Sequence, residues 1–183
     1  MTAMPTPPVA LDEATLAFAE AIFAAARSGD SPRLAELLAL GMPANLRNHA
    51  GDSLLMLASY HGQLQSSRLL LEQGADPQLR NLRGHTPLAG AAFKGDLAML
   101  DLLLAHGADV EGRCADGKTA LMMAAMFNRT AIIERLIERG ADLQASDAAG
   151  VTALGAAAMM GAHDAQALLQ QLADKRGNPQ DAR

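Results

Sequence analysis

Histidine, cysteine and glycine are the residue types in this sequence whose spacing bears on metal or phosphate chemistry. The five histidines include no pair four residues apart, and the single cysteine, Cys114, gives them no set of thiolate partners for zinc. The glycines recur too regularly to mark a phosphate-binding loop. Serine, histidine and aspartate all occur, but nothing in their order indicates a catalytic triad. We therefore expect no catalytic residue, no metal and no cofactor, in a protein that is not an enzyme.

The glycines follow a period of 33 residues along most of the chain. Three series share this step, and one slot of the third holds Asn128 in place of glycine. Their members are Gly51, Gly84, Gly117 and Gly150; Gly41, Gly74, Gly107 and Gly140; and Gly29, Gly62, Gly95 and Gly161. A fixed period of this length indicates one supersecondary unit copied along the chain.

The repeated unit has a recognisable sequence. It reads Gly-His-Thr-Pro-Leu at 84–88, has an alanine pair at 91–92, a leucine run at 102–104 and Gly-Ala-Asp at 107–109. This pattern returns in phase four times between about residues 17 and 173 and resembles the ankyrin repeat, in particular small stand-alone ankyrin repeat proteins of bacteria. The resemblance implies an all-α solenoid of helix-turn-helix units with short β-hairpin tips.

Local chemistry agrees with helices at these positions. A hydroxyl residue precedes each first helix and can accept hydrogen bonds from its free N–H groups. Alanines keep that helix thin, so that neighbouring units approach closely. Glycine, or Asn128 as the next-best residue, suits a left-handed turn at its end. The expected caps are Ser53, Thr86, Thr119 and Thr152.

The repeat pattern also divides the chain. We expect one ankyrin repeat domain over 11–173, between a disordered arm at 1–10, which is proline-rich and uncharged, and a flexible tail at 174–183. Within the domain, the expected units are an N-terminal capping helix pair at 11–48, repeats at 49–81, 82–114 and 115–147, and a C-terminal repeat at 148–173.

Composition restricts the environment and the partners. The 183 residues carry a formal net charge of −5, which argues against nucleic acid as a partner, because that affinity comes largely from a basic face. The apolar stretch at 14–26 is too short and too charged to span a membrane, and no basic region precedes it as in a signal peptide. A single cysteine fits the reducing cytoplasm. We expect a cytoplasmic monomer.

Large apolar and aromatic residues gather at two adjacent positions of the repeat, just before the turn that ends the first helix. Three of the chain's five aromatic residues lie there. In ankyrin-like stacks this helix end and the hairpin tips form the concave face. The column therefore predicts an apolar surface for a protein or peptide, while the alternative is that its side chains fill gaps between units. Its members are Tyr60, His61, Phe93, Lys94, Met126, Phe127, Met159 and Met160.

Polar residues of the tips flank this column. Arg83, His85 and Lys118 are candidates for a polar rim that attracts an acidic partner, against the alternative of a solvated tip. A column of Arg47, Arg80 and Arg113 is interpreted as ordinary hairpin surface. Cys114 is expected to be a small, partly exposed tip residue without an activating partner.

These observations favour a non-catalytic protein-interaction module that binds an unknown protein or peptide on its concave apolar face. An alternative comes from the resemblance alone. Small bacterial ankyrin-like proteins include companions of catalases, which implies a regulatory or protective accessory to an enzyme, for example in oxidative-stress defence. Ten methionines agree with that alternative, since methionine can be oxidised on a surface.

Overall fold

The computed structural model describes residues 13–177, and this part of the chain contains ten helices and no strand. The predicted arm at 1–10 lies outside it. The helices form five pairs: α1 (Glu13–Ser28) with α2 (Ser31–Ala39), α3 (Leu54–Tyr60) with α4 (Leu64–Glu72), α5 (Pro87–Lys94) with α6 (Leu97–Ala105), α7 (Ala120–Met126) with α8 (Thr130–Glu138), and α9 (Ala153–Met160) with α10 (His163–Gly177). The all-α solenoid is confirmed.

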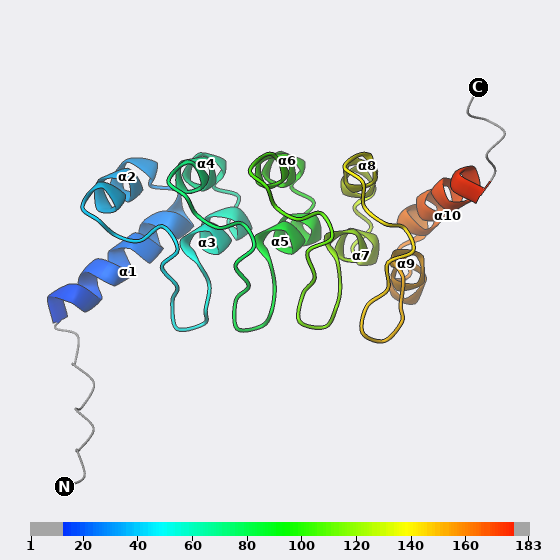
Figure 1. The fold of residues 1–183 in the computed structure, drawn as a ribbon, viewed down its shortest axis with the longest axis horizontal. Coiled ribbons are helices and arrows are strands. Elements are labelled where there is room, and N and C mark those ends of the chain that lie inside the picture. The colour runs from blue at the N-terminus through cyan, green and yellow to red at the C-terminus, as the bar shows by residue number, and fades with distance from the viewer. Residues whose placement is uncertain (1–12, 178–183) are drawn as a thin grey trace, which may run out of the picture.

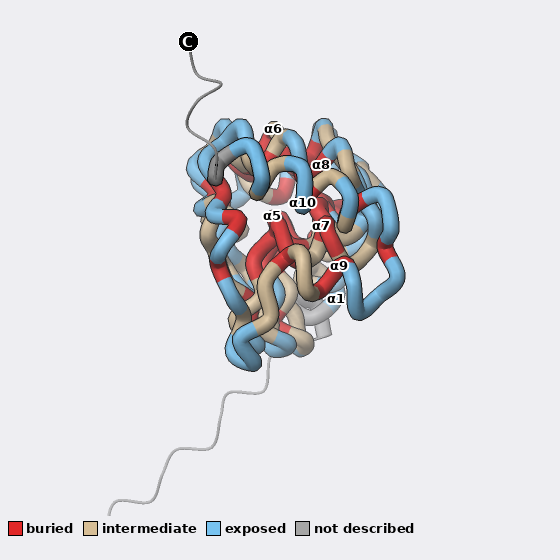
Figure 2. Tube along the Cα trace, turned by 90° about the vertical axis from the view of Figure 1, so that its right-hand side faces the viewer, coloured by how far each residue is buried: buried red, intermediate tan, exposed pale blue. Residues whose placement is uncertain are grey.

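The pairs stack side by side in one direction (Figure 1). Helices α2, α4, α6 and α8 form an outer row, α3, α5, α7 and α9 form an inner row, and loops project beyond the inner row. Each inner helix contacts the next inner helix. The inner helices are mostly buried, whereas the outer helices carry both buried and exposed residues and the loops are largely exposed or intermediate (Figure 2).

Small side chains allow this close stacking. Ala58, Ala92, Ala124, Ala125 and Ala157 of the inner helices are fully buried between neighbouring units. The outer helices contribute larger side chains to the same continuous core, among them Leu70, Leu100, Leu103, Ile133 and Leu136. The predicted thin first helix is therefore present, and the core runs through the stack as one cluster.

The predicted helix caps are formed in all four repeats. The hydroxyl oxygens of Ser53, Thr86 and Thr119 accept hydrogen bonds from backbone N–H groups three residues later, at 3.1, 3.2 and 3.4 Å, and Thr152 does the same at 3.3 Å. Each cap of this kind stabilises a helix by about 1 kcal/mol. The turn after the inner helix is left-handed as predicted, with φ of 77° at Gly95 and 55° at Asn128.

Four loops, which we call the first to fourth tips, connect the repeats: residues 48–52, 81–85, 114–118 and 147–151. Isolated antiparallel bridges flank the first and fourth tips, Arg47 to Ser53 and Ser146 to Thr152, and the predicted β-hairpins do not extend into strands within residues 13–177. Consecutive tips are nonetheless hydrogen-bonded. The backbone N–H groups of Leu82, Ala115 and Ala148 donate to carbonyls of the preceding tip, each at 3.1 Å.

This close approach explains a requirement for glycine at the tips that periodicity alone does not reveal. A Cβ atom on Gly84 would lie 2.1 Å from the Cβ of Ala115, and one on Gly117 would lie 2.7 Å from the backbone nitrogen of Ala148. At the other end of the chain, α10 continues to Gly177. The helix therefore enters the segment at 174–183 that was predicted to be a flexible tail, and residues 178–183 lie outside the described part.

Candidate partner-binding face

The ends of the four inner helices bear the predicted apolar column, and its members differ in exposure. Tyr60, Met159 and Met160 are 43, 76 and 53% exposed, and His61 and Lys94 are also exposed. Phe93, Met126 and Phe127 are half-buried. We call this surface, together with the four tips, the partner face.

Aromatic contacts connect three of the repeats across this face. The rings of Phe93 and Phe127 meet edge to face, with 4.5 Å between centroids. The ammonium nitrogen of Lys94 lies 5.0 Å from the centroid of the Tyr60 ring. Contacts of these two types each contribute about 0.5–1.5 kcal/mol. The side chains at the ends of α3, α5 and α7 therefore hold one another in place, which explains why Phe93 and Phe127 are half-buried.

The two methionines at the end of α9 extend the face toward the C-terminal repeat. Sequence left open whether the C-terminal segment covers Met159 and Met160. Helix α10 packs against α9, α8 and α7 but leaves both side chains more than half exposed. Met159 and Met160 therefore have the largest exposed fractions among the apolar side chains of the column.

The tips are organised by side-chain oxygens that the sequence did not single out. Asn48, Asn81 and Asp147 each accept two backbone N–H groups, from the residues two and four positions later, at 2.9–3.1 Å. These oxygens fix the turn, as Asn and Asp side chains commonly do. A signal was available, since Asn81 follows Asn48 by 33 positions and Asp147 follows Asn81 by 66, but Cys114 interrupts their column.

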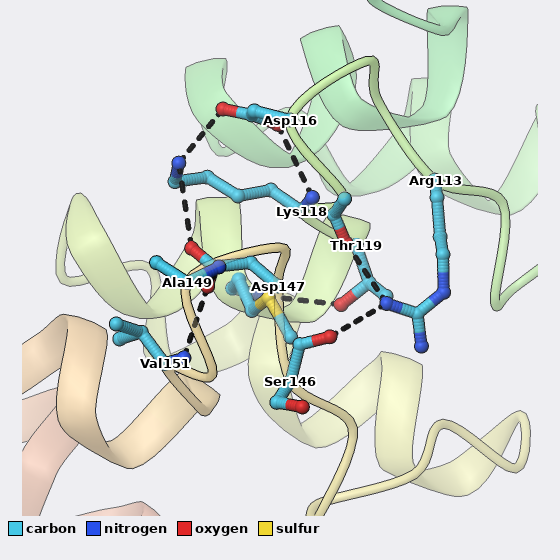
Figure 3. A network of polar contacts seen from close by, with 10 residues as sticks. Arg113, Asp116, Lys118, Thr119, Ser146, Asp147, Ala149 and Val151 are labelled. Atoms are coloured by element: carbon cyan, nitrogen blue, oxygen red, sulfur yellow. Dashed lines mark hydrogen bonds and ion pairs between the residues drawn. The ribbon is translucent and has the colours of Figure 1, made fainter.

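Lys118, a predicted rim residue, is bound by the chain's own carboxylates (Figure 3). Its ammonium lies 2.7 Å from Asp116 of the same tip and 3.6 Å from Asp147 of the next. The hydrogen bond with Asp116 raises the pKa of Lys118 and lowers that of the Asp116 carboxyl. The pKa of Asp147 is lowered first by the Val151 N–H, then by the Ala149 N–H and the Lys118 charge. Lys118 therefore joins two tips.

Arg83 and His85, the other predicted rim residues, are exposed on the second tip. Neither side chain forms an ion pair or a hydrogen bond with residues of the described part. Their side chains are therefore available to a partner in a way that Lys118 is not.

Cys114 is buried, at 4% exposure, so the expected partly exposed position is wrong. Burial raises the pKa of its thiol, and the hydrogen bond from the Thr86 backbone only partly opposes this. A buried thiol with a raised pKa is a poor nucleophile. Cys114 therefore acts as a small, buried apolar residue at the start of the third tip.

Two of the three arginines in the column, Arg47 and Arg113, are part of the scaffold. Arg47 donates to the Gly51 carbonyl at 2.9 Å and to the Arg80 carbonyl of the next repeat. Arg113 repeats this arrangement with the carbonyls of Gly117 at 3.0 Å and Ser146 at 2.7 Å (Figure 3). These two guanidinium groups thus connect consecutive repeats, which is more than the ordinary surface role expected for them.

Residues 112–119 carry the letters Gly-x-x-x-x-Gly-Lys-Thr, which is the spacing of a phosphate-binding loop. The structure does not form such a loop here. The backbone N–H groups of Gly112, Ala115 and Gly117 all donate to protein carbonyls, Lys118 is paired with carboxylates, and the Thr119 hydroxyl caps α7. No strand precedes the segment in the described chain. The pattern is a coincidence of the repeat.

Among the described residues, no three His, Cys, Asp or Glu side chains are arranged to hold a metal ion. No helix of that part is long and apolar enough to cross a membrane.

Comparison with known proteins decides the family. A family model described as ankyrin repeats in three copies matches residues 21–114 and again 91–180. The chain belongs to the ankyrin repeat family. A curated protein of Pseudomonas aeruginosa, also named as an ankyrin repeat protein, is 61% identical over 69 residues. That match spans 38% of this chain and 39% of the relative, well under half of either protein. The ankyrin repeats generally serve as protein-interaction modules, and this family is generally non-enzymatic.

Proposed function

We propose that this ankyrin repeat protein binds a protein or peptide partner through the partner face, without catalysing a reaction. Two contacts between neighbouring repeats support this most: Lys94 lies over the Tyr60 ring, and Phe93 packs against Phe127. Tyr60 and Lys94 remain exposed. A surface that is ordered before binding loses less conformational entropy when the partner arrives.

The expected partner is a protein or peptide, and not nucleic acid, because the chain is acidic overall. We further propose that the protein acts as a monomer in the cytoplasm, where its single buried thiol remains reduced. Buried aromatic anchors often contribute about 2 kcal/mol or more to an interface, so Tyr60, Phe93 and Phe127 are the residues expected to dominate.

The proposal is tested by identifying a partner captured from cell extract and measuring its Kd by calorimetry. Tyr60→Ala and Phe127→Ala are each expected to weaken binding about tenfold or more, as removal of an interface anchor does. Phe93→Ala serves as a third variant, with circular dichroism to confirm its fold. Leu40→Ala is the matched control, because Leu40 is 70% exposed at the end of outer helix α2. Equal affinity of all variants and the parent chain would refute the proposal.

A second candidate function is an accessory of an enzyme in oxidative-stress defence, and the exposure of Met159 and Met160 favours it. Exposed methionines are oxidised reversibly to the polar sulfoxide, which alters an apolar surface. To distinguish the two candidate functions, the partner's Kd is measured again after mild peroxide treatment. Mass spectrometry then identifies which methionines are oxidised. Unchanged affinity after oxidation of both methionines argues against the second function.

A further inference from the structure

We propose that the partner segment is a peptide with acidic residues near one end and large apolar residues near the other. This inference rests on the proposed function, because it concerns the occupant of the same partner face. It follows from an uneven distribution of free charge and apolar surface along the stack.

The second repeat supplies cations that no protein carboxylate neutralises. Arg83 on the second tip and Lys94 at the end of α5 are exposed, and neither forms an ion pair within residues 13–177. The Lys94 ammonium lies over the Tyr60 ring, 5.0 Å from its centroid. The nearest acid in sequence, Asp96, accepts the Met99 N–H and caps α6.

The carboxylates on the neighbouring tips are already engaged. Asp52 accepts the side-chain amide of Asn81 at 2.8 Å and that of Asn48 at 3.4 Å. Asp116 is paired with Lys118. Asp52 keeps its charge, but neither it nor any other carboxylate of residues 13–177 pairs with Arg83 or Lys94. The second tip and the end of α5 therefore present two exposed, unpaired cations, although the chain as a whole carries −5.

The C-terminal half of the face has the opposite character. Helix α9 ends in Met159 and Met160, which are 76 and 53% exposed, and α7 ends in half-buried Met126 and Phe127. The fourth tip adds Ala148 and Ala149, both exposed, and Lys118 of the third tip is bound by two carboxylates. Arg129, two residues after Phe127, turns back to α5, where its Nε donates to the Phe93 carbonyl at 3.2 Å. The ends of α7 and α9 themselves offer adaptable apolar contact, which suits aliphatic or aromatic side chains.

The stack sets the separation of the two regions. Helix α5 contacts α7, and α7 contacts α9, so two interhelical steps separate the cationic from the apolar region. Helices in contact lie about 8–10 Å apart, which gives about 16–20 Å. An extended peptide rises about 3.3 Å per residue, so its acidic and apolar groups should be about five or six residues apart. Opposite charge at one end would also fix the direction in which the peptide binds.

The test is to pan a phage-displayed library of random peptides, about 16 residues long so that an extended peptide exceeds 20 Å, against the full chain. Enriched peptides are then labelled with fluorescein and titrated. We expect acidic clusters about five or six residues from large apolar side chains. The double variant Arg83→Glu, Lys94→Glu should weaken their binding about tenfold or more. Arg68→Glu is the control, because Arg68 is exposed on outer helix α4.

The outcomes separate this inference from the proposed function. In one outcome, the enriched peptides bind Phe127→Ala and Met160→Ala more weakly but show no acidic bias and bind the charge-reversed double variant normally. This result would overturn the inference and leave the proposed binding face in place. Peptides that bind equally to every variant, or the absence of any enriched peptide, would overturn both. If Arg68→Glu weakens peptide binding as much as the double variant does, the change in net charge alone explains the weaker binding, and the inference is overturned.

Discussion

Asn128 lies at the turn between α7 and α8 and also supports the first turn of α10 in the next repeat. Its φ of 55° is the left-handed conformation that glycine takes in the other repeats. Its side-chain oxygen accepts the Ala165 N–H at 2.8 Å, and its amide donates to Asp164 at 2.9 Å. Ala162, just before α10, has no side chain that could cap that helix. Asn128 therefore provides the missing cap from the preceding repeat.

This double role predicts an order of stability. Asn128→Gly keeps the turn and loses the cap, so it should destabilise the protein by about 0.5–1 kcal/mol. Asn128→Ala loses the cap and also places a Cβ-bearing residue in the left-handed region, which adds about 1 kcal/mol. Urea unfolding measures both. A glycine variant at least as stable as the parent chain would show that the cap contributes nothing.

The elements of the fold were largely predictable because their signals are local. A hydroxyl before each inner helix, alanines within it and a glycine after it each act within a few residues, and all appear at the predicted positions. The tips were less predictable. Their side-chain bonds and the contact between Gly84 and Ala115 join residues brought together only by stacking. Within residues 13–177, strand pairing is limited to isolated bridges, each inside a single loop.

The fourth tip gives a test of what its carboxylate does. Asp147→Asn should keep the turn, because Asn48 and Asn81 form the same bonds in other tips. Asp147→Ala should lose these bonds and melt at a lower temperature than Asp147→Asn at neutral pH. The comparison is made by thermal melts, and equal melting temperatures would contradict a role for the side-chain oxygen.

The same residue predicts a pH dependence. The folded pKa of Asp147 lies below its ordinary value of 3.8, so its ionised form stabilises the fold above that pH. This contribution is lost as the pH falls through the lowered pKa. The parent chain should therefore lose more melting temperature than Asp147→Asn between about pH 5 and pH 2.5. Parallel curves would exclude this linkage.

At the scale of the whole molecule, the period of 33 residues placed the candidate residues in one column, but it could not give their exposure. Phe93 and Phe127 lie 34 positions apart, one more than the period, so their rings meet diagonally across two repeats. That contact half-buries both, while Met159 and Met160 at the end of the column stay exposed. Likewise, Lys118 belongs to the predicted rim by position, and only the neighbouring tip reveals that its charge is already paired.

A stack in which each unit contacts mainly its neighbours should respond to a core defect according to the place of the defect. Leu169 of α10 and Leu103 of α6 are 1 and 0% exposed, and truncating a buried leucine to alanine costs about 2–5 kcal/mol. Helix α10 contacts only α7, α8 and α9 substantially. Leu169→Ala should therefore speed amide hydrogen exchange in α9 and α10 and leave α3 and α4 protected, whereas Leu103→Ala should speed exchange on both sides of α6. Exchange followed by mass spectrometry resolves the helices separately. If Leu169→Ala accelerates exchange equally in every helix, the stack unfolds as one unit, and the rigid display proposed for the partner face extends over all of its repeats.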